Sequence, residues 1–392
     1  MSEKTINKVP NVPNLRFVKY SDTIKKWRCS DFLNTFSTNS LSWDQLNYID
    51  KSDLKNLHYG LIHNGAPTLI DCDEYQLPFA QTEIKNYTLC NNGDVIFADA
   101  SEDTKDICKP VEFINISQEK VVSGLHTIHA RDIKDLTVIG FKGYLFSSYN
   151  FHKQVHRLTQ GTKIFSINPS NFKEMFVGIP SVEEQRDIVN LLSKIDKRIS
   201  TQNKIIKEYK SYRNRILHTI YNNLNDYEYL SLNQVCNITT GKLDANAMNP
   251  NGKYKFFTCA KEDYYIDTYS FDGESLIISG NGEVGLIKYF VGKFDAYQRT
   301  YVLQNFTKNP LYIKVALEIE LPKKLHREKN VGAMPYIVLS TLSDIKIKIP
   351  NKELVSNIAL IVTSLDKKIA IEEQILNDYL SQKKHLLANM FI

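Results

Sequence analysis

The sequence predicts an α+β protein in which two mixed α/β domains are joined by two long helices that form an antiparallel coiled coil. Three observations lead to this fold class. A segment of 43 residues is repeated in similar form without a gap. After its opening Ile-Pro pair, each copy contains no glycine or proline, and short strand-like runs lie in the sequence outside the copies. The duplication predicts a pseudo-two-fold internal repeat.

The repeat relates residues 179–221 to residues 349–391 at a constant offset of 170 positions. Both copies begin with an Ile-Pro pair, at Ile179 and Ile349, and both contain an Asp-Lys pair, at Asp196 and Asp366. A gapless repeat of this length indicates that the chain uses one structural element twice.

Each copy is expected to be a single long helix, from Ser181 to Tyr221 and from Asn351 to Ile392, because neither segment contains glycine or proline. At 1.5 Å per residue, each helix would extend roughly 60 Å. Ser181 followed by Glu184 fits a capping box at the start of the first helix.

The spacing of apolar residues in both segments follows the heptad pattern of a coiled coil, in alternating steps of four and three. The first seam consists of Ile188, Leu192, Ile195, Ile199, Gln202, Ile206, Tyr209, Arg213, Ile216 and Ile220. The second seam consists of Ile358, Val362, Leu365, Ile369, Glu372, Leu376, Tyr379, Lys383, Leu386 and Met390.

Polar residues interrupt both seams. If the two helices pair antiparallel, the polar residues of one seam are predicted to lie opposite those of the other. We expect Arg213 to face Glu372 and Gln202 to face Lys383, since opposed polar pairs in an apolar seam fix its register. The alternative is that each helix packs separately on its own domain.

The segments between the helices differ in length and align only weakly with each other. Strand-like runs end in turn signals at residues 94–98, 275–279, 286–291 and 345–349. The expected boundaries are therefore a first domain at 1–178, a central helix at 179–222, a second domain at 223–348 and a C-terminal helix at 349–392.

Charge gives little indication of a partner, because the two domains are almost neutral. Residues 15–178 contain 18 basic and 19 acidic residues, and residues 223–349 contain 15 and 14. A strongly basic domain would by itself have indicated nucleic-acid binding. The six cysteines form no metal-ligand spacing, and the sequence shows neither a signal peptide nor a long apolar run, so a cytoplasmic location with reduced thiols is expected.

No catalytic motif is recognisable in the sequence, and no metal site is predicted. One glycine-rich segment, Gly280–Gly285, satisfies a dinucleotide-binding pattern, but β-like residues follow it where such a site needs a helix. Asn281-Gly282 fits a hairpin turn better.

At this point the residues resemble a known family, the specificity subunits of Type I restriction–modification systems. The resemblance rests mainly on Ile-Pro-Ser-Val-Glu-Glu-Gln-Arg-Asp-Ile at 179–188 and on its second copy at 349–358. That second copy departs from the family pattern at Leu354 and Val355, where Glu-Gln usually stands. Weaker similarities lie at 13–17 with Trp27, at 56–60, at 273–279 and at 297–303.

The resemblance implies a non-catalytic protein with two target-recognition domains, each reading one half of a bipartite double-stranded DNA site. The helices would separate the domains and bind two methyltransferase subunits that carry S-adenosylmethionine and methylate adenine. Separate ATP- and Mg-dependent translocase/nuclease subunits would join for restriction, and the chain itself would bind no cofactor.

Candidate DNA contacts are polar or aromatic residues in and beside predicted loops, because arginine, lysine, asparagine and glutamine bond base edges. In the first domain they are Asn56, His58, Tyr59, Ser101, Lys105, Gln154 and Arg157. In the second domain they are Asn281, Lys288, Tyr297, Gln298 and Arg299, around a predicted strand–turn–strand, and Arg327 and Lys329, in a predicted polar loop at 323–330.

The sequence is also compatible with other roles for these residues and for the whole chain. Each of these side chains has an ordinary structural alternative, such as a half-buried aromatic ring, a hydrogen-bonded core histidine or a solvated lysine. The whole chain is also compatible with a coiled-coil scaffold that carries two protein-binding modules, or with a divergent nuclease or methyltransferase.

Overall fold

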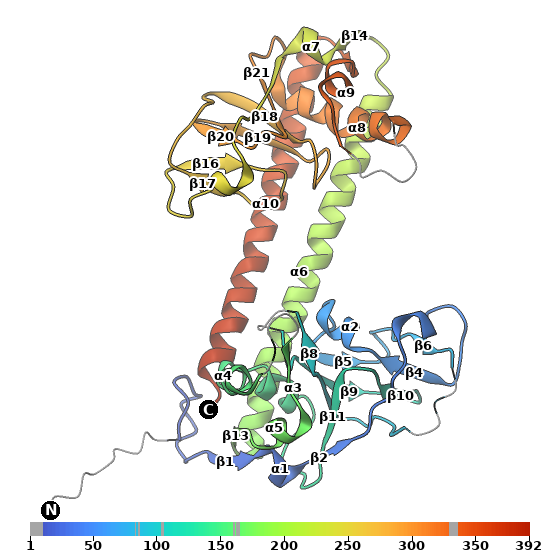
Figure 1. Cartoon of the computed structure of the whole chain (residues 1–392), viewed down its shortest axis with the longest axis vertical. Helices are drawn as coiled ribbons and strands as arrows, with labels where there is room; N and C mark the ends of the chain where they lie inside the picture. The colour runs from blue at the N-terminus through green and yellow to red at the C-terminus, as the bar shows by residue number, and fades with distance from the viewer. Residues whose placement is uncertain are drawn as a thin grey trace, which may run out of the picture. The chain divides into compact units, whose positions relative to one another are not determined.

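The computed structural model describes residues 11–82, 84, 87–102, 106–159, 161, 165–328 and 336–392 (Figure 1). The chain divides into two compact units, Met1–Thr201 with Leu376–Ile392, and Gln202–Ile375. The division passes through both long helices, so each unit contains one α/β domain together with a stretch of each helix. The four parts predicted from the sequence were instead divided at the ends of the helices. The division into compact units keeps each domain together with its stretch of both helices.

Both long helices are present and begin one residue after the expected starts, as α6 (Val182–Asn222) and α10 (Lys352–Asn389). The Glu184 backbone N–H donates to Ser181 Oγ over 3.4 Å, but the Glu184 carboxylate accepts from Arg16 instead of returning to the helix start. The capping box is therefore only half formed. At the second start, the Leu354 N–H donates to Asn351 Oδ1 over 2.9 Å.

The departure of the second copy from the family pattern has a packing reason. Glu184 and Gln185 are buried, and Gln185 bonds the backbone of Val138 and Leu136. The equivalent residues, Leu354 and Val355, pack with an apolar cluster in the second unit. Each pair suits the surface that its own domain presents.

In each unit the two helices run antiparallel, and all the predicted seam residues are buried or half-buried. The predicted polar pairing is wrong, however. Arg213 bonds Asp366 and not Glu372, while Glu372 accepts from Gln202 over 2.5 Å. Lys383 pairs with Asp196 over 2.5 Å and not with Gln202. The two ion pairs thus place each basic residue six positions away from its predicted partner.

The ion pairs repeat the duplication of the sequence. Asp196 in α6 corresponds to Asp366 in α10, and Arg213 in α6 corresponds to Lys383 in α10, both at an offset of 170. In each unit, therefore, an ion pair joins the two helices, with the carboxylate on one repeat copy and the basic side chain on the other.

The first unit contains a five-stranded main sheet, a four-stranded sheet and two short strand pairs among its described residues. The main sheet has the order β2 (Leu33–Phe36), β11 (Thr127–Asp132), β7 (Val95–Ala98), β9 (Pro110–Asn115), β5 (Leu69–Asp71). The four-stranded sheet has the order β10 (Lys120–Ser123), β4 (Leu54–Leu57), β6 (Phe79–Ala80), β3 (Leu46–Asn47). The pairs are β1 (Lys25–Arg28) with β13 (Phe176–Ile179), and β12 (Phe165–Ser166) with β8 (Ala100–Ser101). The helices are α1 (Cys29–Phe32), α2 (Tyr59–His63), α3 (Phe141–Phe146), α4 (Tyr149–Leu158), α5 (Pro169–Lys173) and a 3₁₀ turn, Trp43–Gln45.

The second unit contains a four-stranded main sheet, a three-stranded sheet and one strand pair among its described residues. The main sheet has the order β15 (Asn237–Thr240), β21 (Thr300–Gln304), β18 (Glu274–Ser279), β19 (Ile287–Val291). The three-stranded sheet has the order β17 (Tyr264–Ile266), β16 (Tyr254–Phe257), β20 (Phe294–Ala296), and β14 (Glu228–Ser231) pairs with β22 (Lys346–Ile349). The helices are α7 (Leu232–Val235), α8 (Pro310–Glu328), α9 (Leu339–Ser343) and a 3₁₀ turn, Ala245–Ala247.

The two domains share a topology that their weakly aligned sequences do not reveal. In each, the first strand pairs with the strand before a long helix, as β1 with β13 and β14 with β22. A one-turn helix leads to an edge strand, β2 or β15, which pairs with β11 or β21. The side sheets match as well, since β4 pairs parallel with β10 and β16 pairs parallel with β20.

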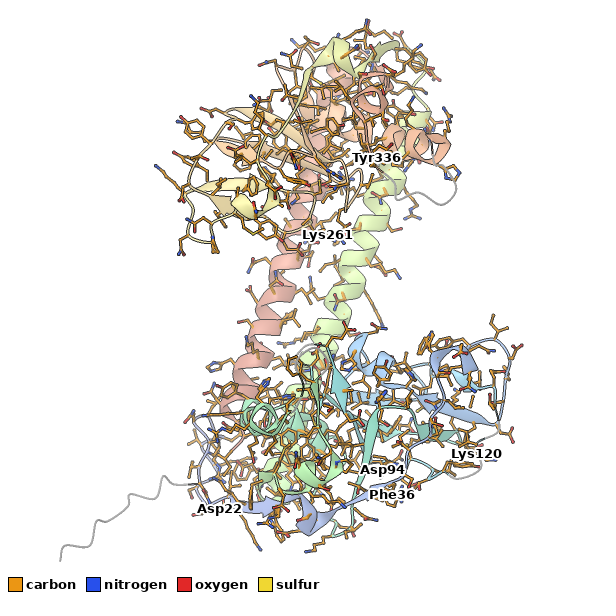
Figure 2. All side chains as sticks on the ribbon, in the orientation of Figure 1. Asp22, Phe36, Asp94, Lys120, Lys261 and Tyr336 are labelled. Carbon is orange, nitrogen blue, oxygen red and sulfur yellow. The ribbon has the colours of Figure 1, made fainter. Side chains whose placement is uncertain are left out.

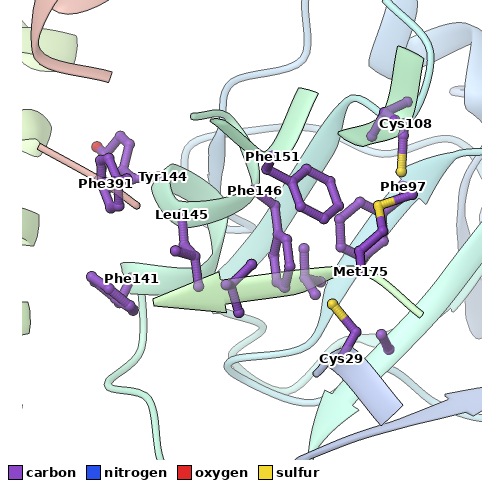
Figure 3. Packing of buried hydrophobic residues seen from close by; sticks show 14 of the residues in the cluster. Cys29, Phe97, Cys108, Phe141, Tyr144, Leu145, Phe146, Phe151, Met175 and Phe391 are labelled. Carbon is purple, nitrogen blue, oxygen red and sulfur yellow. The ribbon is translucent and has the colours of Figure 1, made fainter. Parts of the chain in front are cut away.

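The core of the first unit contains aromatic residues from the main sheet and the flanking helices (Figure 3). Phe97 of β7 packs edge-on against Phe146 at a centroid distance of 5.0 Å, and Phe146 packs against Phe151 at 4.8 Å. Leu386 and Met390 of α10 belong to the same cluster as Ile188 of α6. The domain core and the helix seam are therefore one continuous apolar cluster, which attaches the domain firmly to the helices.

Candidate nucleic-acid interface

Three loops of the second domain meet at one end of its main sheet: residues 258–263 after β16, 280–286 between β18 and β19, and 297–299 before β21. We call these residues the second loop edge. Backbone hydrogen bonds tie them together. The Gly280 N–H donates to Arg299 O over 2.9 Å, the Tyr297 N–H donates to Phe257 O over 2.9 Å, and the Ile337 N–H donates to Gly280 O over 2.8 Å.

The first domain has the same arrangement at residues 58–63, 99–101 and 124–126, which we call the first loop edge. The Asp99 N–H donates to His126 O over 3.0 Å, the Gly124 N–H donates to Leu57 O over 2.9 Å, and the Ile167 N–H donates to Asp99 O over 3.0 Å. Each bond corresponds to one at the second loop edge. The equivalent sites are thus identified by hydrogen bonding, without sequence alignment.

The second loop edge presents polar side chains on a fixed backbone. Gln298 and Arg299 are exposed, and Asn281 is half-buried beside them. In the part of the chain that the structure describes, the Arg299 guanidinium makes no hydrogen bond or ion pair. These three candidates and half-buried Tyr297 are therefore brought together. Exposed Lys261 lies in the adjoining loop, and Tyr336 precedes the residue that bonds Gly280 (Figure 2).

Lys288, another candidate, has a structural role at this edge. Its Nζ donates to the carbonyl oxygens of Ala260 and Lys261 over 3.1 and 2.7 Å, and it pairs with Asp263 over 3.0 Å. Although partial burial opposes ionisation, Lys288 and Lys255 lower the pKa of Asp263. The Lys288 ammonium is thus committed to ordering the loop at 258–263.

The first loop edge carries aromatic rings and histidines. His58 Nδ1 accepts from the Gly60 N–H over 3.0 Å and caps α2, and its ring lies 5.4 Å from Trp43 and 4.5 Å from Tyr59. Burial, with a contribution from nearby His126, lowers the pKa of His58. His58 is therefore a buried helix cap that packs against Tyr59, which is half-buried at the edge.

Sequence reasoning missed His126, which is the exposed histidine of this edge. Its side chain is 52% exposed, and Nδ1 lies 3.4 Å from Asp99 Oδ1. Burial raises the pKa of Asp99, and His126 offsets this only in part. No periodicity or motif marks His126, because its position depends on the turn at 124–126 meeting Asp99 across the sheet.

A family model described as "Type I restriction modification DNA specificity domain" matches residues 77–210 and 225–378, which is most of the chain. The chain belongs to this family.

Two curated relatives are similar to parts of this specificity-family chain. The specificity subunit of the Type I restriction enzyme EcoDI of Escherichia coli is 34% identical over 145 residues, which cover 37% of this chain and 32% of that protein. A putative Type I specificity subunit of Mycoplasma pneumoniae is 26% identical over 208 residues, covering 50% of this chain and 76% of that protein. The chain thus spans about a third of the first relative's length and about three quarters of the second's.

A solved structure agrees with the fold over nearly the whole specificity-family chain. The Type I restriction–modification S subunit from M. genitalium gives a TM-score of 0.60, covers 97% of this chain and 99% of that one, and is 16% identical. This likeness confirms the fold: two mixed α/β domains and two long helices.

In the structure of this family member, two predicted contacts are engaged within the protein: Asn56, which is buried, and Gln154, which is half-buried. Asn56 is fully buried, and its Nδ2 donates to Asn39 Oδ1 over 3.0 Å. Both amide atoms of Gln154 bond the Phe176 backbone, over 2.8 and 3.0 Å. Gln154 thus binds backbone directly, and Asn56 does so through Asn39, whose Nδ2 donates to Ser123 O.

The remaining candidates lie at several places. Ser101 is half-buried in β8, and Arg157 is exposed near the end of α4. The loop predicted at 323–330 is wrong for residues 323–328, because α8 continues past Pro322 to Glu328 and Arg327 is an exposed residue of its last turn. In this last part of α8, Leu325 lies beside Gly285 of the second loop edge. Lys105 and Lys329 lie outside the described residues.

The glycine-rich segment is a hairpin loop, as predicted. It joins antiparallel strands β18 and β19, and Gly282 and Gly285 have φ values of 59° and 81°. Positive φ favours glycine and suits a tight loop. A strand follows it instead of a helix, so the loop lacks the helix N-terminus that a dinucleotide phosphate requires.

A buried cluster in the first domain has donor atoms of metal-ligand type. Atoms of Cys90, Asp94 and His129 lie within 4.8 Å of one another. Asp94, however, already accepts from His129 Nε2 over 2.7 Å and from two nitrogens of Arg131 over 2.7 Å (Figure 2 labels Asp94 and Phe36 nearby). The guanidinium supplies the positive charge that a cation would, so the cluster is an ion-pair network.

No described helix is long and apolar enough to cross a membrane.

Proposed function

We propose that this chain is the DNA-recognition subunit of a Type I restriction–modification complex and reads a bipartite, asymmetric target. The observation that carries the proposal is the pair of loop edges. They occupy the same place in two domains of the same topology, yet their side chains differ: Tyr59 and His126 in one, Gln298 and Arg299 in the other. Two different readers on one duplicated scaffold suit a target with two different halves.

The chemistry of the complex is assigned to other subunits. We place S-adenosylmethionine and adenine methylation on two methyltransferase subunits, and ATP, Mg²⁺ and cleavage on separate translocase/nuclease subunits. The chain itself acts as a non-catalytic subunit in the cytoplasm and binds no cofactor. Its near-neutral domains support a sharing of the DNA phosphate contacts with other subunits, because few phosphates would be neutralised by the chain alone.

Co-expression with the adenine methyltransferase from the same genome tests the proposal. Methylated adenines are then mapped by single-molecule sequencing, and the chain is used to co-purify its partner. We expect a two-part motif with an unread spacer, absent when the chain is omitted, and co-purification of two methyltransferase subunits. Methylation that does not depend on the chain, or a chain that binds only other proteins, would instead favour a scaffold.

A further inference from the structure

We propose that His126 and Arg299 occupy one equivalent reading position, each contacting a base edge in the half-site that its own domain recognises. This inference rests on the proposed function and deepens it, because it names the residue that determines specificity at one position of each half. It also adds a contact, His126, that neither composition nor motif indicates.

The equivalence comes from the backbone. Each residue directly precedes the central strand that pairs with the edge strand: Thr127 begins β11 and Thr300 begins β21. Each carbonyl accepts the N–H of the residue after the neighbouring strand, Asp99 or Gly280, over 3.0 and 2.9 Å. A side chain at either position therefore leaves the same corner of the main sheet.

His126 is held at that corner at a conformational cost. Its φ is 52°, in the left-handed region that residues other than glycine seldom adopt, although histidine, asparagine and aspartate do so more often than the rest. Buried groups fix the preceding turn, since Asn39 Nδ2 donates to Ser123 O over 2.7 Å and Asn56 Nδ2 donates to Asn39. Strained residues that the surroundings hold in place concentrate at functional sites. Asn56 therefore supports the turn before His126 through Asn39.

Both side chains are available to a ligand. Arg299 is exposed and has no partner among the described residues. The His126 side chain is 52% exposed, although Asp99 approaches Nδ1 to 3.4 Å and the Tyr59 ring packs edge-on against the imidazole at 5.3 Å. Arginine bonds O6 and N7 of guanine in the major groove, and an imidazole offers one donor or acceptor to the same groove. The rival assignment is a phosphate contact, which would weaken binding to every sequence alike.

The test uses the full complex and four variants. His126→Asn and Arg299→Gln remove the proposed contacts, and asparagine tolerates the left-handed φ at position 126. His156→Asn and Lys253→Gln are matched controls at exposed positions outside the loop edges and the long helices. For each variant, methylated adenines are mapped in cells, and the purified complex is titrated with duplexes altered at each position of the wild-type motif.

We expect His126→Asn to relax one position in one half of the motif and Arg299→Gln to relax one position in the other half. Discrimination at that position should fall by roughly tenfold, the loss that one base contact represents. The control variants should keep the wild-type motif.

Three results would overturn the inference: an unchanged motif, uniform weakening on all duplexes, or relaxation of the same half by both variants. His126→Gly is the second variant at this position, and it removes the side chain while glycine adopts the positive φ without strain. If both variants at position 126 lose all methylation, that result also counts against the inference. A wild-type complex that yields no two-part motif would instead overturn the proposed function.

Discussion

At the scale of single residues, the carboxylate of Asp94 shows how a buried charge is kept ionised. Burial by itself opposes ionisation, but hydrogen bonds from Arg131 and His129 outweigh it and lower the pKa of Asp94. Arg131 also lies over the Phe36 ring at 4.9 Å, so the network joins β11 to the neighbouring edge strand β2. The ionised carboxylate therefore stabilises the main sheet of the first domain.

Replacing Asp94 by asparagine should destabilise the protein by about 3–5 kcal/mol at neutral pH, because Arg131 and His129 lose their charged partner. A folded-state pKa below the unfolded value of about 3.9 means that the stabilisation is present above that pH and is lost as the pH falls through the folded value. The difference between wild type and Asp94→Asn should therefore shrink below about pH 4. Urea unfolding across pH measures this.

The control for that experiment is Asp53→Asn, since the Asp53 side chain is 95% exposed. It should change the free energy of unfolding by less than about 0.5 kcal/mol. A cost at Asp94 that does not vary down to pH 3 would contradict the assigned role of its charge.

At the second loop edge, Arg299→Ala should weaken binding of the complex to its cognate site by about 1–3 kcal/mol. The reason is that Arg299 is the exposed guanidinium on a backbone fixed by Gly280. Titration of labelled duplexes measures the loss. Lys253→Ala, at an exposed position outside the loop edges and the long helices, should leave the affinity unchanged, and unchanged binding by Arg299→Ala would remove Arg299 from the interface.

At the scale of elements, the polar residues of the helix seam are paired across the helices and also with a domain. Arg213 bonds Asp366 of α10, and its Nη1 lies 2.9 Å from Glu318 of α8. In the first unit, Lys383 pairs with Asp196, which also accepts from Tyr144 of α3 over 2.9 Å. The helix register and the seating of each domain are therefore set by the same charged groups.

Arg213→Met should destabilise the second unit by about 1–3 kcal/mol, less than a fully buried pair because Asp366 and Glu318 are partly exposed. A double-mutant cycle of Arg213→Met with Asp366→Asn should show coupling of at least about 0.5 kcal/mol. The same cycle with Glu372→Gln should show less, and Arg215→Met serves as the exposed control. Stronger coupling to Glu372 would restore the register predicted from the sequence.

At the scale of the whole molecule, each unit combines a domain with part of both long helices. Leu386 and Met390 join the core of the first unit, and Leu217 and Ile358 join that of the second. The first unit is thus built from two separate segments of the chain. Each domain also has a smaller apolar cluster without residues of the long helices, around Ile96 and Phe113 in the first domain and around Phe257 and Phe294 in the second. The net charge of each domain is also small, at one unit or less in magnitude.

The chain alone should therefore bind DNA with a shallow salt dependence. Each neutralised phosphate contributes about −0.9 to the slope of log K against log salt, and we expect fewer than about four such contacts for the chain by itself. The complex with methyltransferase subunits should show a clearly steeper slope. Fluorescence anisotropy at several KCl concentrations measures both slopes, and equal slopes would contradict this division of phosphate contacts.

Much of the fold was predictable from local pattern. The strand-like runs at 94–98, 275–279, 286–291 and 345–349 each correspond to a strand within one residue, at β7, β18, β19 and β22. Site residues were less predictable. Gln298 and Arg299 share one turn and so were found together, whereas Asn56 and Lys288 have the same polar character but serve the interior and a loop.

The two long helices, the apolar seam of each and the duplication follow from the sequence alone, because heptad spacing and a gapless repeat are local and periodic signals. The antiparallel direction was also predicted, but the polar pairs used to predict it are not the ones that form. Only the tertiary structure decided the register, the common topology of the domains and the place of His126. The register depends on carboxylates outside the seam, such as Asp366 and Glu318, and His126 reaches its loop edge through strand pairing. Such contacts join residues far apart in the chain, where periodicity carries no information.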